Sequence, residues 1–220
     1  MVKKFFAVLI TLSAITGTLA TQKAYCMDWG LGGFYSSDFG GGYKASFAGI
    51  YAAHSKTPLT NFGIFFMLDF KYVDLETGLF YSGGKWEDYI VGVGTDKFKF
   101  SGFGMNFGAY FKCPINAGSK TVVLPLLGTE FKRMLTGSLN GQSINDMVGD
   151  FNTIWGKAGV GVDLRLTEKR SINLKVLYGA RFTNKFEDNN IANFRYSYSG
   201  VKVDSITGHG LDIKAAVVFR

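Results

Sequence analysis

The sequence predicts an all-β protein, specifically an eight-stranded antiparallel up-and-down transmembrane β-barrel. Three observations indicate this fold class. Apolar and polar residues alternate in short runs, the connections between these runs are alternately short and long, and the composition favours strands. Glycine (29), phenylalanine (21) and tyrosine (11) are frequent, whereas proline (3) is rare. Such a mixture is typical of strands joined by tight turns rather than of helices.

The chain begins with the features of an export signal. A short basic start, "MVKK", precedes an apolar run over 5–20, which is the build of a secretory signal peptide. Small residues allow a cut after Ala20 or after Cys26. We favour a signal peptide over 1–26 and a barrel over 27–220, because strand-like sequence starts at once after Cys26. A lipoprotein cut before Cys26 is a third reading, which the large Tyr25 disfavours.

Charge and cysteine content exclude several classes of partner. The net charge of +7 falls to +5 without Lys3 and Lys4, and to +4 without Lys23. Since basic residues do not cluster with aromatics, we expect no nucleic-acid partner. After a cut behind Cys26, Cys113 is alone and is read as a small packing residue; an earlier cut leaves one disulfide as an alternative. No cysteine or histidine pattern indicates a metal, and we expect no cofactor.

The first three predicted strands cover 28–37, 61–70 and 73–83. The second and third form the stretch "FFMLDFKYVDLETGLFY", in which apolar and polar residues alternate with one break near Lys71-Tyr72. Alternation with a period of two is that of a β-strand, whose successive side chains point to opposite faces. The break therefore predicts a hairpin turn.

The remaining strands follow the same alternation. Their predicted ranges are 99–112, 120–133, 154–166, 171–183 and 208–219. The last three have an apolar face free of charge, as in Val160, Val162 and Leu164. The 120–133 run is the least regular, because both of its faces are apolar before Glu130 and because Pro125 cannot donate a ladder hydrogen bond.

The connections alternate in length along the whole chain. Strands two and three are joined by about two residues, four and five by "PINAGS", and six and seven by "TEKR". The longer segments between them cover 38–60, 84–98, 134–153 and 184–207. Bacterial outer-membrane barrels have short turns on the periplasmic side and longer loops outside. An even number of strands also places both chain ends on the periplasmic side.

Charge is confined to one face of the predicted strands. A lysine or arginine that faces lipid at mid-bilayer costs about 2–4 kcal/mol, so the charge-free face is predicted to contact lipid. The other face lines the lumen, where charges must be paired or hydrated. The predicted lumen ion-pair network consists of Asp69, Asp74, Glu76, Lys112, Glu130, Lys132, Lys157, Asp163, Arg165, Lys175, Arg181, Asp212 and Lys214. Side chains fill a barrel of eight strands, which excludes a wide pore.

Aromatic residues near the ends of the predicted strands are consistent with girdles at the two membrane interfaces. They are Trp29, Phe62, Phe70, Tyr72, Tyr81, Phe111, Phe131, Trp155, Phe182 and Phe219.

Over about 28–220 the chain resembles the small eight-stranded bacterial outer-membrane barrels, namely the OmpX/OmpW type and the transmembrane part of OmpA. The resemblance is architectural and implies a location in the cell outer membrane. Those barrels end in a strand that closes on phenylalanine, which the insertion machinery reads. Here Phe219 is penultimate and Arg220 follows. The resemblance transfers no functional residue to this chain.

Catalysis is not expected. One type of lipid-modifying enzyme on such barrels uses a His-Ser pair and an acid on the lipid-facing surface. His54 is expected in a loop and His209 at the rim, and neither has a serine two residues later on a strand. Asp74 and Glu76 share a face and form a conceivable acid–base couple, but paired lumen carboxylates explain them more simply. Nor does "GFGMNFG" have the spacing of a dinucleotide-binding loop.

The sequence therefore predicts a non-enzymatic outer-membrane barrel, with three roles left open. These are envelope structure, surface contact through the long loops, and narrow passage of small solutes. The expected partners of this monomer are outer-membrane lipid, the insertion machinery and an extracellular partner. The alternation in "NFRYSYSGVKV" predicts that the last two strands continue beyond the membrane and offer an edge for strand addition, which deletion of 190–203 would test.

A soluble secreted barrel of the lipocalin kind is the alternative. It would enclose an apolar ligand, so Phe66, Leu68 and Val160 would point inward while Lys157 and Asp163 faced water. The alternation of short and long connections has no explanation in such a barrel.

Overall fold

The structure is a computed structural model that describes residues 27–47, 50–56, 58–90, 94–145, 148, 152–182 and 201–220. The predicted signal peptide, 1–26, lies outside these residues. No helix in the described part of the chain is long and apolar enough to cross a membrane.

In the described part of the chain, eleven strands form a single sheet that closes on itself. They are β1 (Asp28–Phe47), β2 (Ile50–Lys56), β3 (Leu59–Phe70), β4 (Val73–Ile90), β5 (Gly94–Lys112), β6 (Ile115–Asn116), β7 (Thr121–Leu139), β8 (Gln142–Ser143), β9 (Thr153–Thr167), β10 (Arg170–Arg181) and β11 (Val201–Phe219). The antiparallel ring β1-β3-β4-β5-β7-β9-β10-β11 contains eight strands and closes through β11 and β1. The predicted eight-stranded antiparallel barrel is confirmed.

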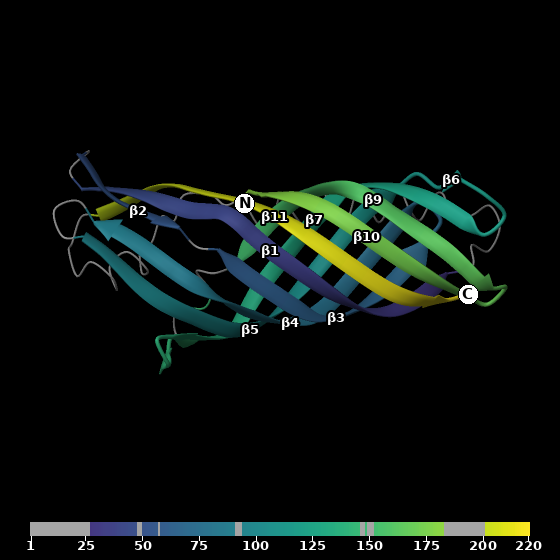
Figure 1. The fold of residues 1–220 in the computed structure, drawn as a ribbon, viewed down its shortest axis with the longest axis horizontal. Coiled ribbons are helices and arrows are strands. Elements are labelled where there is room, and N and C mark those ends of the chain that lie inside the picture. The colour runs from purple at the N-terminus through teal and green to yellow at the C-terminus, as the bar shows by residue number, and fades with distance from the viewer. Residues whose placement is uncertain are drawn as a thin grey trace, which may run out of the picture.

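Both ends of the barrel chain meet at one end of the molecule. Trp29 on β1 lies opposite Phe219 on β11, and their rings stack with centroids 4.4 Å apart. The β3–β4 and β9–β10 turns are short, as predicted, and the β5–β7 connection contains β6. Figure 1 shows β6 and the C-terminus at this end and β2 at the opposite end. We call the first the short-turn end and the second the extended end.

At the extended end, strands replace much of what the sequence predicted as long connections. β4 and β5 remain paired from Val73↔Phe111 up to Ile90↔Gly94, through most of the predicted loop 84–98. Similarly, β1 runs on to Phe47 and β7 to Leu139. These extensions lack a continuous apolar face, but ladder hydrogen bonds involve only the backbone and can propagate outward from the barrel.

β2 and β3 return along β1 as two successive pieces. Lys44 to Phe47 of β1 pair with β2, and Asp38 to Asp28 pair with β3. Pro58 separates the two pieces. Proline has no N–H to donate, so it is tolerated where the ladder is interrupted.

The continuation of β11 differs from the prediction in its partner. Its first residues, Val201 to Thr207, pair with β1 rather than with β10, and the β10–β11 ladder ends at Ala180↔His209. The rest of the segment proposed for strand addition lies outside the described residues.

Inward-facing glycines let neighbouring strands approach closely. At Gly128, a Cβ atom would lie 2.1 Å from the Ala109 carbonyl oxygen and 2.7 Å from the Tyr110 Cα. Only glycine fits such an approach of two backbones. The space gained allows the large Tyr110 side chain to be buried in the lumen.

Candidate functional site

The outer surface of the barrel is an apolar belt. Large apolar side chains on it are strongly exposed, including Ile64 (68%), Leu127 (65%) and Val176 (50%). On β4, the outward positions from Val73 to Gly83 carry no charge, and Lys85 is the first charged residue beyond them. On the other seven barrel strands, outward positions are free of Asp, Glu, Lys and Arg over a comparable length, and on β7 this charge-free stretch ends at the exposed Arg133.

The height of this belt matches a membrane. About ten residue steps of ~3.3 Å on strands tilted by about 40° give roughly 25 Å, which is the height of the apolar band of outer-membrane barrels. A transmembrane barrel has apolar side chains on its outer surface and charged side chains in its interior. A lipocalin-like barrel has the reverse arrangement. Phe66 and Val160 are accordingly exposed, while Lys157 and Asp163 are buried.

The lumen is centred on a buried lysine between two carboxylates. Lys214 Nζ lies 2.6 Å from Glu76 Oε2 and 2.9 Å from Glu130 Oε2. The Tyr110 hydroxyl donates to Glu130 Oε2 at 2.9 Å and lies 3.1 Å from Lys214 Nζ. All four side chains are buried, so these charges are stabilised by one another rather than by bulk water.

One branch of ion pairs leads from this centre through β10 to β3. Lys175 Nζ lies 2.8 Å from Glu76 Oε1 and 2.6 Å from Asp74 Oδ2. The other oxygen of Asp74 lies 2.5 Å from Lys112 Nζ, and Lys112 also pairs with Asp69. Each lysine here joins two carboxylates.

A second branch starts at Glu130. Its Oε1 lies 2.8 Å from Lys157 Nζ, and Lys157 also pairs with Asp212. The same oxygen lies 3.9 Å from Lys132 Nζ, which is 3.5 Å from Asp38 Oδ1. This branch therefore joins β7, β9, β11 and β1.

We call this connected set the lumen network. Its members are Asp38, Asp69, Asp74, Glu76, Lys112, Glu130, Lys132, Lys157, Lys175, Asp212 and Lys214. They come from all eight barrel strands, and five lysines face six carboxylates. Because every lysine touches a carboxylate on another strand, the network cross-links the barrel wall through its interior.

Aromatic and apolar side chains fill the space beside the network. Lys214 Nζ lies 5.0 Å from the centroid of the Tyr110 ring and 5.8 Å from the centroids of Phe34 and Phe65, distances at which cation–π attraction acts. A buried apolar cluster adjoins these rings and contains Phe34, Phe65, Met67, Phe80, Phe100, Met134, Leu139, Ile144, Ala216 and Val218. Alternation alone does not predict this inward apolar cluster, because its residues share the inner face with the charged ones.

Ten of the residues predicted for the lumen lie in the network, and three do not. Asp163 is buried but pairs with Arg220 at the short-turn end. Arg165 is exposed close to the end of β9, and Arg181 is half-buried at the end of β10. Alternation assigns a side chain to a face correctly, but near a strand end the inward face opens to water.

Several contributors to the interior were missed. Asp38 accepts hydrogen bonds from Ser36 Oγ at 3.3 Å and Asn61 Nδ2 at 3.4 Å, but the predicted strand ended at 37. Extending the alternation of Phe34 and Ser36 by one step would have identified it. Arg220 follows the last strand residue, and the same one-step extension beyond Ala216 and Val218 would have placed it on the inner face, although not its pairs with Asp163 and Asp28.

The aromatic prediction holds for the outer surface with one exception. Trp29, Phe62, Tyr72, Phe111 and Phe182 are exposed on the barrel exterior. Trp155 was predicted in the interfacial girdle, but it faces the lumen and is 2% exposed. Its indole N–H donates to Thr153 Oγ1 at 2.9 Å, and Lys132 Nζ lies 5.1 Å from its ring.

The two histidines also differ from the prediction. His54 lies on β2 instead of in a loop. His209 lies well inside β11, on the exterior, and its Nδ1 is 2.8 Å from the Tyr178 hydroxyl. Among the described residues, no group of three or more His, Cys, Asp or Glu could hold a metal ion. Cys113 is exposed between β5 and β6, and Cys26 lies outside the described residues.

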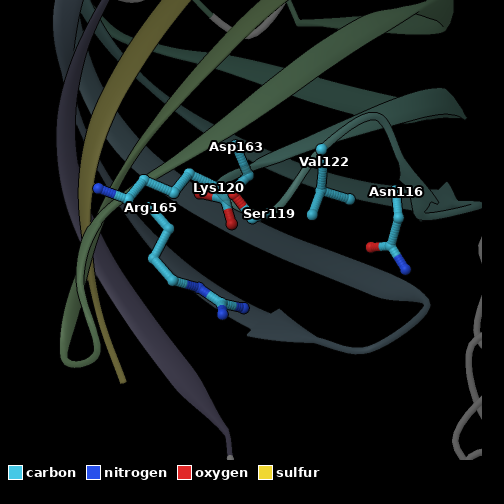
Figure 2. Close-up of a pocket in the computed structure, with 7 residues that line it drawn as sticks. Asn116, Ser119, Lys120, Val122, Asp163 and Arg165 are labelled. Atoms are coloured by element: carbon cyan, nitrogen blue, oxygen red, sulfur yellow. The ribbon is translucent and has the colours of Figure 1, made fainter.

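A pocket opens at the short-turn end, between the β6–β7 connection and β9 (Figure 2). Its volume is about 340 Å³, and it is lined by Asn116, Gly118, Ser119, Lys120, Val122, Asp163 and Arg165. We call it the mouth pocket. It lies apart from the lumen network, since none of its lining residues belongs to that network.

Comparison with known proteins gives distant likeness in structure alone. No family model matches the chain, and no curated protein matches it. Solved structures to which it is similar include the outer membrane protein OprG from Pseudomonas aeruginosa, with 11% identity and a TM-score of 0.49 over 90% of this chain and 97% of that one.

The protease OmpT from Escherichia coli is 8% identical, with a TM-score of 0.48 over 91% of this chain and 99% of that one. The attachment invasion locus protein Ail from Yersinia pestis is 12% identical, with a TM-score of 0.37 over 88% and 99%. Likeness at this level carries no argument about activity.

Proposed function

We propose that this chain is a non-enzymatic outer-membrane barrel whose lumen is closed by its own side chains, and that it serves envelope structure and surface contact. One observation carries the proposal, namely a charge-free apolar exterior around a buried, nearly neutral charge network. The exterior suits hydrocarbon, and the interior needs neither bulk water nor a ligand to neutralise its charges.

Cell fractionation and electrophoresis test the location. We expect the mature protein in the outer-membrane fraction, with a faster gel mobility before boiling than after it, because a closed barrel stays compact in mild detergent. Recovery as a detergent-free soluble protein would instead support the lipocalin-like alternative.

The closed lumen is tested by electrical recording. The refolded barrel is expected to show no steady conductance in a planar bilayer, because both oxygens of Glu76 and of Glu130 accept from lysines on other strands and these side chains fill the lumen. A stable open channel would favour passage of small solutes over a closed structural barrel.

Lipid and the insertion machinery are the partners proposed on the membrane side. Phe219 of the terminal strand stacks on Trp29 and would be read by the machinery before the barrel closes. Phe219→Ala is expected to lower the folded amount in cells more than the yield of refolding in detergent. Equal losses in both would limit Phe219 to a packing role.

Surface contact is proposed for the extended end. There the β4–β5 hairpin projects beyond the belt and is joined by a 3.3 Å ion pair between Glu87 and Lys97. Shortening this hairpin is expected to abolish binding of an extracellular partner while leaving the barrel folded. Unchanged adhesion of cells that carry the shortened form would contradict this role.

A further inference from the structure

The mouth pocket has an excess of positive charge. Lys120 and Arg165 line it, and within the described part of the chain neither forms an ion pair. Asp163 is the one carboxylate in the lining. Its Oδ2 already pairs with Arg220, whose Nε lies 3.4 Å from Asp28 Oδ2. An anion would therefore be attracted to the pocket.

Buried polar atoms without partners gather beside these cations. They are Asp163 Oδ1, Ser171 Oγ, and both Oδ1 and Nδ2 of Asn173. The three residues are 8%, 0% and 1% exposed. Buried polar groups of native proteins almost always have a hydrogen-bond partner, so these atoms are available to hydrogen-bond a bound molecule.

Strand register brings the unpartnered atoms and the cations together. Across the β9–β10 ladder, Asn173 lies opposite Asp163 and Ser171 lies opposite Arg165. All four positions follow the inward alternation of their strands. The only other unpartnered buried side chain in the described residues is Asn106 on β5, which is separated from β9 by β7.

From this arrangement we propose that the mouth pocket binds a phosphate group linked to an amine or hydroxyl. Lys120 and the Arg165 guanidinium would hold the phosphate through charge-assisted hydrogen bonds. Asp163 Oδ1 would accept from the amine or hydroxyl, and Asn173, which lies opposite Asp163 on β10 but outside the pocket lining, would support the site from behind. The volume of about 340 Å³ equals that of roughly eleven water molecules, which is enough for such a group.

Two kinds of molecule contain a phosphate group linked to an amine or hydroxyl. One is a free phosphorylated amine that reaches the pocket from the aqueous compartment. The other is a phospholipid headgroup, since Leu166 on β9 and Ile115 on β6 are exposed beside the pocket and could contact acyl chains. The proposal concerns binding by the barrel itself and does not depend on the role proposed above.

Calorimetric titration of O-phosphoethanolamine into the refolded full chain, in phosphate-free detergent, tests the free source. We expect saturable binding that Lys120→Gln and Arg165→Gln each weaken by about tenfold or more, because each removes a charge-assisted contact. Lys169→Gln is the matched control, because Lys169 is exposed at the same end but does not line the pocket. Its binding should equal that of the wild type.

The variant Asn173→Leu tests whether the pocket binds a ligand or holds only water. It removes two unpartnered atoms at nearly constant volume, so it is expected to weaken binding while leaving the unfolding temperature unchanged or higher. Binding that is unaffected by Asn173→Leu and by the Lys120→Gln/Arg165→Gln pair would overturn the proposal, as would no binding to the wild type in detergent or in bilayers.

Nanodiscs distinguish the two sources. With phosphatidylethanolamine in the bilayer, occupation by a headgroup would block O-phosphoethanolamine, whereas a phosphatidylcholine bilayer would leave the site free because its quaternary ammonium has no N–H to donate. Equal binding in both bilayers would assign the pocket to the free solute.

Discussion

Lys214 is a buried charge that is stabilised by the opposite charges around it. It is 1% exposed and lies between Glu76 and Glu130. Removing one partner from a buried pair leaves an uncompensated charge, which costs about 3–5 kcal/mol. Here the remaining lysines beside each carboxylate offset part of that cost.

Lys214→Met is therefore expected to lower the free energy of unfolding by about 3 kcal/mol. Urea unfolding of the barrel refolded in liposomes measures it. Lys85→Met, which removes an exposed lysine outside the network, is the control and should change little. The double variant Lys214→Met/Glu76→Gln should lose less than the sum of its single changes, and strict additivity would refute the coupling.

Gly128 is the second residue at which the structure predicts the effect of a substitution on stability. A Cβ atom there would lie 2.1 Å from the Ala109 carbonyl oxygen, so Gly128→Ala must push two strands apart. Overpacking of this kind typically costs about 1–3 kcal/mol. Gly118→Ala is the control, because a Cβ atom at Gly118 would have no other atom within 4 Å. Similar unfolding curves for both variants would contradict the close approach.

At the residue scale, the sequence predicted which side chains face inward but not which of them meet. Alternation placed Lys175 and Asp212 on the inner face, where they are buried. Their partners depend on contacts across the barrel, and these follow from closure and stagger rather than from local spacing. For the same reason, the opening of the lumen around Arg165 was not foreseen.

A strand of this barrel separates two environments along its whole membrane segment. On β10, Val176 is 50% exposed on the outside while its neighbour Lys175 is 1% exposed inside. A one-residue shift would exchange these faces along the strand. The cost of charge in lipid therefore helps to fix the register.

Val176→Lys tests this at the centre of the belt. A lysine facing lipid there should lower stability in bilayers by about 2–4 kcal/mol. Leu135→Lys is the matched control, because Leu135 is also exposed but lies beyond Arg133, outside the charge-free belt. Near the interface the cost falls to about 0–1 kcal/mol. Equal effects at both sites would argue against a bilayer around the barrel.

At the element scale, strand order, direction and the short turns were predictable, because alternation and turn residues are local signals. Strand lengths were not. The segment 84–98 has no clear apolar face, yet β4 and β5 stay paired through most of it. Its pairing depends on a neighbouring strand already held in place, which a single run of sequence does not reveal.

At the scale of the whole molecule, the two ends of the barrel predict its orientation in the outer membrane. The extended end is expected outside the cell and the short-turn end in the periplasm. An epitope tag inserted between Ile90 and Gly94, which pair at the extended end, should be detected by antibody on intact cells. The same tag inserted at 168–169, in the β9–β10 turn, should be detected only after the cells are permeabilised. Detection of the second tag alone on intact cells would show the reverse orientation.

The central claim is that hydrocarbon contacts the apolar exterior while ionic side chains face the closed interior. Its most direct test is a nitroxide label at Val176→Cys, in a chain without other cysteines, refolded in liposomes and measured by electron paramagnetic resonance. A label that faces lipid at this position is expected to collide often with oxygen and rarely with a water-soluble nickel complex. A label shielded from both reagents, or one reached mainly by nickel, would contradict it.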